Sequence, residues 1–206
     1  MTDTKQDNSH RVQGKDCPPA LAMFAFVWQS RPSKPGVDGV PKPPKYSLQL
    51  VWDAATNLEG IKAAIRAAAA KKWGADQKNW PAGLKNPLRI GNTARKNEIT
   101  GQVDPAYKDK VFVTARSKDK PAVVDRAKQP IVNEMDFYSG CMCKVSLSFG
   151  AYEVEGGKGI AAYLGPIQKV ADGPRLAGQR DPDEEFNDEG DAPASSSGAA
   201  PINDLF

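Results

Sequence analysis

The sequence of 206 residues has few of the side chains that most often carry catalysis or bind metals. Its only histidine, His10, lies in a polar N-terminal stretch, so a histidine-based triad or acid–base pair is not expected. The three cysteines are an odd number, and Cys141 and Cys143 lack the usual Cys-x2–4-Cys spacing of zinc ligands. The chain also has no Gly-Lys-Ser/Thr phosphate loop. We predict a protein that is not an enzyme and uses no metal or cofactor.

Long apolar runs are missing as well. No stretch approaches the roughly 18 apolar residues that a membrane-spanning helix needs. The first residues, MTDTKQDNSHRVQGKD, lack the apolar segment of a signal peptide. Hydrophobic residues make up 40% of the chain and charged residues 26%, which is ordinary for one domain with a real core. We therefore expect a cytoplasmic protein.

Lysine and arginine are absent from residues 181–206, which hold eight of the 25 acidic residues. Residues 1–180 consequently carry a formal charge of about +11, against about −8 for this tail. A stretch this polar cannot bury enough apolar surface to offset its ordering entropy, so we expect it to be disordered. The basic body indicates a polyanionic partner, of which nucleic acid is the commonest.

The tail nevertheless ends in the apolar tip INDLF. Asp204, Leu205 and Phe206 combine acidic and apolar side chains, which is typical of a peptide ligand for a pocket with basic walls and an apolar floor. The alternative is a tail that only increases solubility.

The rest of the chain reads as strands interrupted by long loops. Residues 1–20 are polar and expected to be loosely ordered, and residues 21–180 are expected to form the domain. A helix is predicted from a Thr56–Glu59 capping box to Gly74, with Leu58, Ile61, Ile65 and Ala68 facing inward. Apolar or alternating patterns predict strands at residues 21–29, 46–53, 111–117, 122–125, 138–152 and 158–170, the last one broken at Gly165-Pro166.

This order of elements predicts a mainly β fold, an elaborated OB-fold. The OB-fold is a five-stranded Greek-key barrel, here with one principal α-helix, long loops and a disordered C-terminal tail. The proline-rich, basic segment 31–45 joins two of the strands. It is either a solvated connection or one wall of a groove that binds phosphates.

Strand 111–117 has an aromatic and a basic side chain on its non-core side. Val111, Val113 and Ala115 read as core, whereas Phe112 and Arg116 share the other side, which Lys118 continues. An aromatic residue and an arginine on one polar face are typical of base stacking and phosphate binding. The alternative is a lone exposed phenylalanine, or one covered by the long loop of residues 74–110.

Several segments resemble a phage family of single-stranded DNA-binding proteins over about residues 15–180. They are YSLQLVWD, KNPLRIGN, VFVTARSKDKPAVVD, YSGCMCKVSLSFGAY and GKGIAAYLGPIQKVADG. The resemblance implies an OB-fold that coats single strands during phage DNA replication, recombination and repair, in the cytoplasm of the infected bacterium. It also implies that the acidic tail docks replication proteins and competes with DNA for the cleft.

From the alternation of core and non-core side chains we predict a groove on the non-core face of two strands. Its proposed lining is Phe112, Arg116 and Lys118 together with Tyr138, Lys144 and Tyr152, flanked by Tyr107, Lys42, Lys45, Lys85 and Arg89. A register error of one residue would exchange the two faces. The competing functions are a strand-annealing or recombination mediator and an adaptor protein that binds no DNA.

Overall fold

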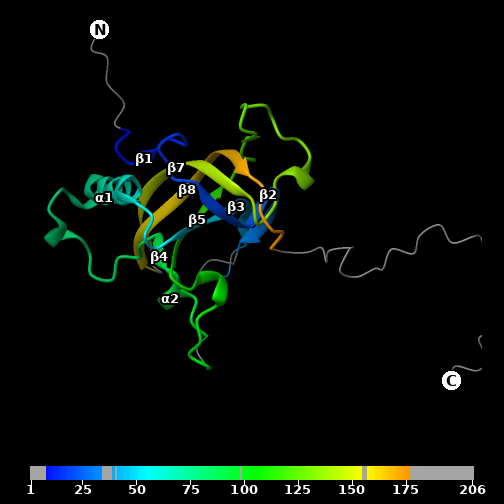
Figure 1. Cartoon of the computed structure of the whole chain (residues 1–206). Helices are drawn as coiled ribbons and strands as arrows, with labels where there is room; N and C mark the ends of the chain where they lie inside the picture. Colours follow the sequence, from blue (N-terminus) through cyan, green and yellow to red (C-terminus); the bar gives the residue numbers. More distant parts are fainter. Residues whose placement is uncertain (1–7, 34–38, 40, 98, 155–156, 177–206) are drawn as a thin grey trace, which may run out of the picture. The chain divides into compact units, whose positions relative to one another are not determined.

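The computed structural model describes residues 8–33, 39, 41–97, 99–154 and 157–176 (Figure 1). The chain divides into a compact unit of residues 1–176 and a second unit of residues 177–206. The second unit contains the predicted disordered tail and its tip, which therefore lie outside the described residues.

Five strands close into a barrel. They are β2 (Ala20–Ser33), β3 (Lys42–Asp53), β5 (Lys110–Ser117), β7 (Met142–Val154) and β8 (Gly157–Ala171). Hydrogen-bonded pairs run from β2 through β3, β5, β8 and β7 back to β2. All pairs in this circuit are antiparallel except β5 with β8, which is parallel. This is the connectivity of an OB-fold, and the predicted fold class is confirmed.

Shorter elements decorate the barrel. The strands β1 (Arg11–Val12), β4 (Leu88–Ile90) and β6 (Val123–Val124) add to β7, β5 and β8. The short helices are η1 (Gln77–Asn79), α2 (Gly91–Ala94), η2 (Pro105–Tyr107) and η3 (Glu134–Asp136). No helix in the described part of the chain is long and apolar enough to cross a membrane.

The core follows the predicted alternation. Every second residue of β3, β5 and β7 points into the barrel, and all three cysteines are buried there as free thiols. The helix α1 (Glu59–Trp73) packs mainly on β7, at one side of the barrel (Figure 1). Its predicted inward stripe is buried, and Gly74 ends it with φ 89°. The inward residues of the three strands are Leu48, Leu50, Trp52, Val113, Ala115, Cys143, Val145, Leu147 and Phe149.

The predicted helix start is wrong. The helix begins at Glu59, its N-cap Leu58 has no capping side chain, and Thr56 makes no capping-box bond. Instead, the Glu59 amide donates to the Asn57 side-chain oxygen at 3.0 Å. Asparagine satisfies orphan amides at helix starts as readily as threonine does, so the first turn is still stabilised.

Further boundaries differ from the sequence prediction. Both ends of the predicted connection 31–45 belong to strands, since β2 runs to Ser33 and β3 begins at Lys42. Part of the predicted loose N-terminus joins the barrel, because β1 pairs with β7 and Cys17 is buried. Strand β7 begins at Met142, so Tyr138 lies in the preceding loop. Strand β8 is continuous through Pro166, since the β7–β8 register shifts between Val145 and Leu147, and such an irregularity tolerates a proline.

Candidate nucleic-acid interface

One open surface of the barrel combines basic and aromatic side chains from three neighbouring strands. In the β2–β3 pair, Phe26 lies opposite Ser47 and Arg31 opposite Lys45, while Ser47 lies opposite Arg116 of β5. Paired residues point to the same side of a sheet, and this side is opposite the core residues Leu48 and Ala115. We call these five side chains, Phe26, Arg31, Lys45, Ser47 and Arg116, the outer face.

Irregularities in β2 present its aromatic rings on this surface. The register advances by three residues in β2, from Met23 to Phe26, but by only two in β3, from Gln49 to Ser47. This extra residue is a β-bulge. Within it, Phe24 has φ 47°, an uncommon conformation for a bulky residue, and its side chain is 48% exposed. The bulge thus turns Phe24 toward solvent instead of the core.

Phe112, predicted to line the groove, and Tyr107, predicted to flank it, do not have accessible rings. Each is 1% exposed, and their rings meet edge to face at 5.1 Å. Together with Met23 and Val51 they form a second small hydrophobic cluster on the outside of the barrel. Phe112 lies on the predicted side of β5, but a covering segment made of α2, Arg95 and η2 packs over it, as the alternative interpretation required.

The buried Tyr107 hydroxyl donates to the side-chain oxygen of Gln49, whose nitrogen donates to Thr114 at 3.0 Å. Burial raises the pKa of the Tyr107 hydroxyl, so this group stays protonated and remains a donor. Both side-chain polar atoms of Gln49 therefore have a partner, which lets this residue lie beneath the covering segment at low cost.

Close packing holds the covering segment in place. A Cβ atom at Gly91 would lie 2.0 Å from the Tyr107 carbonyl oxygen, so only glycine fits there. Asn92 also donates to the Asp109 carboxylate at 2.9 Å and accepts from the Asp109 amide at 2.8 Å. Two arginines stand over the cluster: the guanidinium carbons of Arg89 and Arg95 are each 5.5 Å from the Phe112 ring centroid.

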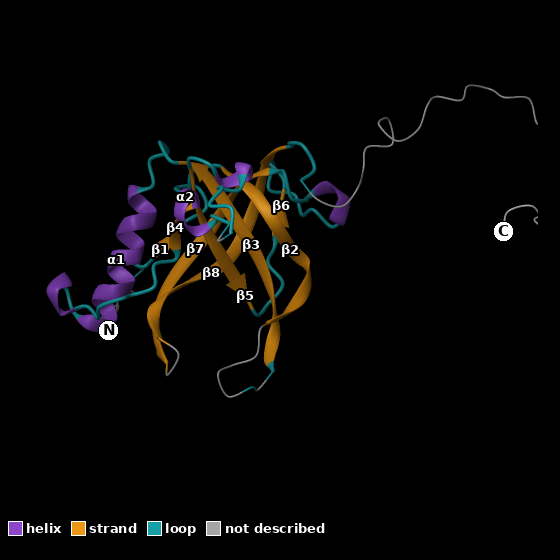
Figure 2. Cartoon of the chain, turned by 90° about the horizontal axis from the view of Figure 1, so that it is seen from below, coloured by secondary structure: helices purple, strands orange, loops and turns teal. Residues whose placement is uncertain are grey.

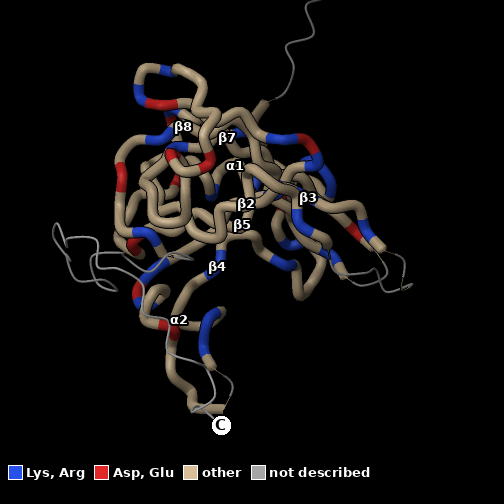
Figure 3. The backbone as a smooth tube through the Cα atoms, turned by 90° about the vertical axis from the view of Figure 1, so that its right-hand side faces the viewer, with Lys and Arg blue, Asp and Glu red and all other residues tan. Residues whose placement is uncertain are grey.

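The cations of the outer face lack acidic partners. Arg31, Lys45 and Arg116 form no ion pair with any described residue, and neither does Lys118, which is exposed just after β5. Lysines elsewhere do pair, for example Lys62 with Glu59 at 2.8 Å. Figure 3 shows basic segments along β3 and beside β4 and α2. Unpaired positive charge of this kind favours a polyanionic ligand.

Two hairpin arms project from the same end of the barrel (Figure 2). The β2–β3 arm carries Lys42, which pairs with Ser33. The β7–β8 arm carries Tyr152, and Lys85 runs beside it, bridged to Gly159. Lys42 and Lys85, which were predicted to flank the groove, therefore lie on or beside these arms. Tyr152, which was predicted to line the groove, belongs to a strand that does not pair with β3 or β5. Contact of these residues with DNA stays a prediction.

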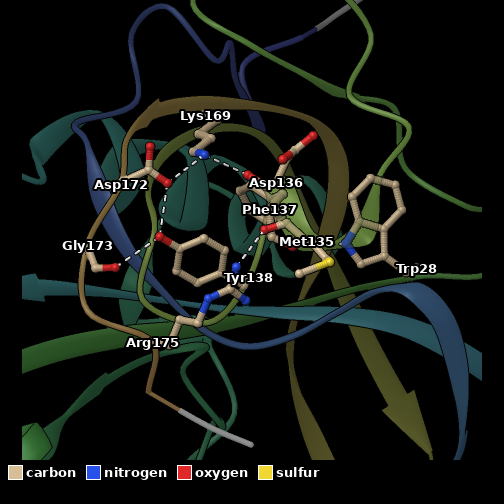
Figure 4. Close-up of polar contacts among 9 residues, drawn as sticks. All are labelled: Trp28, Met135, Asp136, Phe137, Tyr138, Lys169, Asp172, Gly173 and Arg175. Carbon is tan, nitrogen blue, oxygen red and sulfur yellow. Dashed lines mark hydrogen bonds and ion pairs between the residues drawn. The ribbon is translucent and has the colours of Figure 1, made fainter. Parts of the chain in front are cut away.

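Lys144 and Tyr138 do not join the outer face. Lys144 lies in β7 and pairs with Gln168 of β8. Strand β8 separates β7 from β5. The Tyr138 hydroxyl donates to Asp172 at 2.9 Å and to the Gly173 carbonyl at 3.0 Å, and the Arg175 guanidinium lies 4.0 Å from its ring centroid (Figure 4). Because these contacts occupy both its hydroxyl and its ring, Tyr138 anchors the segment that follows β8.

Sequence reasoning missed Phe24, Phe26 and Arg95, and counted Arg31 only as part of a basic loop. Arg31 lies over the Phe26 ring at 4.2 Å, and Arg95 over the Phe24 ring at 5.7 Å. The segment LAMFAFVWQ looked like a uniformly buried strand. The local pattern carried no signal for the exposure of its phenylalanines, because a regular two-residue period would place Phe24 and Phe26 on the same side as the buried Ala22.

An OB barrel that carries unpaired cations beside exposed aromatic rings is typical of single-strand nucleic-acid binders. A family model described as the ssDNA-binding protein of Enterobacter phage Enc34 matches residues 22–195. The chain belongs to this family.

Individual proteins are similar to the chain in sequence or in fold. Protein p50 of Acyrthosiphon pisum secondary endosymbiont phage 1 is 31% identical over 128 residues, which cover 59% of this chain and 65% of that protein. The fold is similar to that of the single-stranded DNA-binding protein from bacteriophage Enc34 in complex with ssDNA, with a TM-score of 0.62 and 19% identity over 81% of this chain and 88% of that one. A second structure of the Enc34 protein has a TM-score of 0.60 and 15% identity, over 86% and 89% of the two chains.

Proposed function

We propose that the chain binds single-stranded DNA without sequence preference on the outer face and the adjoining Phe24 and Arg95. The observation that carries this proposal is the juxtaposition of unpaired Arg31, Lys45 and Arg116 with an aromatic ring of the same surface. Such cations follow the phosphate backbone, while aromatic rings stack on bases of any identity. Coating of single strands in this way would protect them during phage DNA replication, recombination and repair.

The acidic tail extends the proposal. Residues 181–206 carry about −8 charges against about +11 on residues 1–180, and the tether holds them at high effective concentration. The tail competes with DNA for the basic face and so speeds exchange of short strands. Its tip, Asp204, Leu205 and Phe206, recruits replication proteins through a basic pocket with an apolar floor.

The central test compares binding of fluorescent oligo-dT and of a matched duplex over a range of salt concentrations. The variant Arg31→Ala/Arg116→Ala is expected to weaken oligo-dT binding and to make the slope of log K against log salt shallower by about 1.4, since each lost phosphate contact removes roughly 0.7. The matched control, Lys62→Ala/Arg66→Ala on α1, removes the same charge from cations that pair with Glu59. It should leave the slope close to that of the wild type.

Equal binding to single strand and duplex, or equal slopes for the two double variants, would contradict a specific single-strand face. Absence of binding to either DNA would favour the adaptor function instead. Removing residues 177–206 should strengthen oligo-dT binding at low salt, and unchanged affinity would contradict competition by the tail.

A further inference from the structure

The row of paired residues that crosses the outer face continues around the barrel beyond β5. Arg116 lies opposite Tyr163 of β8, Tyr163 opposite Ser148 of β7, and Ser148 opposite Arg11 of β1. Because register partners point to the same side, these side chains share the outside of the barrel with the outer face. In spatial order the complete row is Phe26, Ser47, Arg116, Tyr163, Ser148 and Arg11.

The row repeats one chemical order: an aromatic ring, a small hydroxyl side chain and an arginine, twice over. Neighbouring strands are about 4.8 Å apart, so the row is about 24 Å long when it is followed along the curved surface of the barrel, and about 14 Å of this path lies between Phe26 and Tyr163. OB-folds contact between about 4 and 16 nucleotides. A track of this length suits a bound strand that crosses the barrel strands one after another.

The Tyr163 ring is placed for stacking. It is 50% exposed although it lies in the middle of β8, where buried residues stand on either side of it in the chain. A Cβ atom at Gly150 would lie 2.8 Å from Cε2 of Tyr163, which shows that the ring packs against the Gly150 backbone. With part of its surface fixed on the sheet, the exposed part offers a rigid aromatic surface at little cost in side-chain entropy.

A cavity of about 340 Å³ adjoins this ring. Its lining includes Tyr163, Ser148 and His10 together with Lys71 and Lys72 from the end of α1. The nearest acid to Lys72 is Glu153, at 4.0 Å, with both side chains exposed to solvent. An exposed ion pair of that length contributes little, so Lys72 can exchange this carboxylate for a phosphate.

We infer that Tyr163, Arg11 and Lys72 form a second nucleotide-binding position, which extends the single-strand path from the outer face across β8 to β1. In this arrangement a base stacks on Tyr163, while Arg116 on one side and Arg11 with Lys72 on the other hold the flanking phosphates. This inference rests on the proposed function and adds to it a direction and a minimum length of the bound strand.

The simpler interpretation is that Tyr163 only covers the bare backbone of Gly150, as aromatic residues do for glycine in sheets. That role requires an apolar side chain, whereas stacking requires an aromatic one. Tyr163→Leu and Tyr163→Phe therefore separate the two interpretations, because leucine covers the glycine and phenylalanine both covers it and stacks.

The experiment measures the affinity of the full chain for oligo-dT of about 5 and about 16 nucleotides, lengths near the two ends of the OB-fold range. Tyr163→Leu is expected to lower the affinity for the long oligonucleotide by on the order of 10-fold and to have little effect on the short one. Tyr163→Phe should bind both as the wild type does. As a control for the outer face, Phe26→Leu should weaken binding of both lengths.

If Tyr163→Leu binds the long oligonucleotide with wild-type affinity while Phe26→Leu binds it more weakly, the second position is overturned. The proposed function would then remain intact. Failure of the wild type to bind either length would overturn the proposed function itself. If Tyr163→Leu does not fold, Arg11→Ala takes its place. Arg11 is exposed on the short strand β1, and its loss should make the salt slope for the long oligonucleotide alone shallower by about 0.7.

Discussion

Phe112→Ala distinguishes a structural from a DNA-contacting role for the aromatic residue that the sequence made the first candidate. The ring is 1% exposed, contacts Tyr107 at 5.1 Å and lies below two guanidinium groups at 5.5 Å. Truncating a buried phenylalanine to alanine costs about 3–5 kcal/mol, through lost burial and the cavity that remains. For a domain of this size, each kcal/mol lowers Tm by about 2–4 °C, so a decrease of roughly 6–20 °C is expected.

The assay combines urea unfolding with oligo-dT binding below the unfolding transition. Phe24→Ala is the matched control, because it removes the same ring from a site that is 48% exposed, and its stability should stay within about 1 kcal/mol of the wild type. Folded Phe112→Ala should keep oligo-dT affinity within a few-fold, whereas Phe26→Ala should lose on the order of 10-fold. A Phe112→Ala variant with wild-type stability and strongly reduced DNA affinity would refute the covered position of this ring.

Three further predictions follow from local contacts. Gly91→Ala should destabilise the fold by about 1–3 kcal/mol in urea unfolding, since its Cβ would lie 2.0 Å from the Tyr107 carbonyl oxygen. The control Gly60→Ala in α1, where no atom is within 4 Å of the added Cβ, should be neutral or stabilising by up to about 1 kcal/mol, and equal effects of the two variants would contradict the close packing at Gly91. Tyr138→Phe should lower the free energy of unfolding by about 0.5–1.5 kcal/mol through the lost hydrogen bond to Asp172. Hydrogen bonds from Lys169 and Tyr138 hold the pKa of Asp172 below its usual value, so the variant should raise this pKa and lose stability at a higher pH on acidification; superimposable acid unfolding curves would count against this link. Burial raises the thiol pKa of Cys17 and Cys143. The stability that these thiols contribute should therefore be complete below the unfolded thiol pKa of about 8.5 and fall above it by at most about 1.4 kcal/mol per pH unit for each thiol. Urea midpoints at pH 7 and 9.5 measure this fall, which should be shallower in Cys143→Ala.

The barrel could be predicted from the sequence wherever its strands keep a regular two-residue period. Leu48 and Leu50 in β3 and Val145 and Leu147 in β7 point inward as the alternation requires. Alternation reports which side of a strand is buried in the core, and for these strands one side faces the core. It does not report what covers the other side, and this is why Phe112 was assigned correctly to a face and incorrectly to solvent.

Strand β2 was predicted at residues 21–29, but the outward position of its phenylalanines was not, for a different reason. Its irregular register moves Phe24 and Phe26 relative to the pattern of their neighbours, and a bulge depends on pairing with a partner strand that local sequence does not specify. The covering segment was similarly out of reach, because its contacts join residues distant in the chain, such as Asn92 with Asp109 and Tyr107 with Gln49. Loops without a period carry no signal for such contacts.

The covering segment and the bulge together divide one β surface into a buried part and an accessible part. A barrel exterior with several bare aromatic rings would be a large apolar patch and prone to association. Here α2, Arg95 and η2 cover Phe112, and Arg95 lies over the Tyr107 ring and over the adjoining Phe24. On β2 the bulge leaves Phe24 exposed and Phe26 half-buried, and each of these rings has an arginine over it. In the proposed binding mode, an arginine over a ring moves to a phosphate when a base takes its place, so the unliganded surface would stay shielded without losing the capacity to stack.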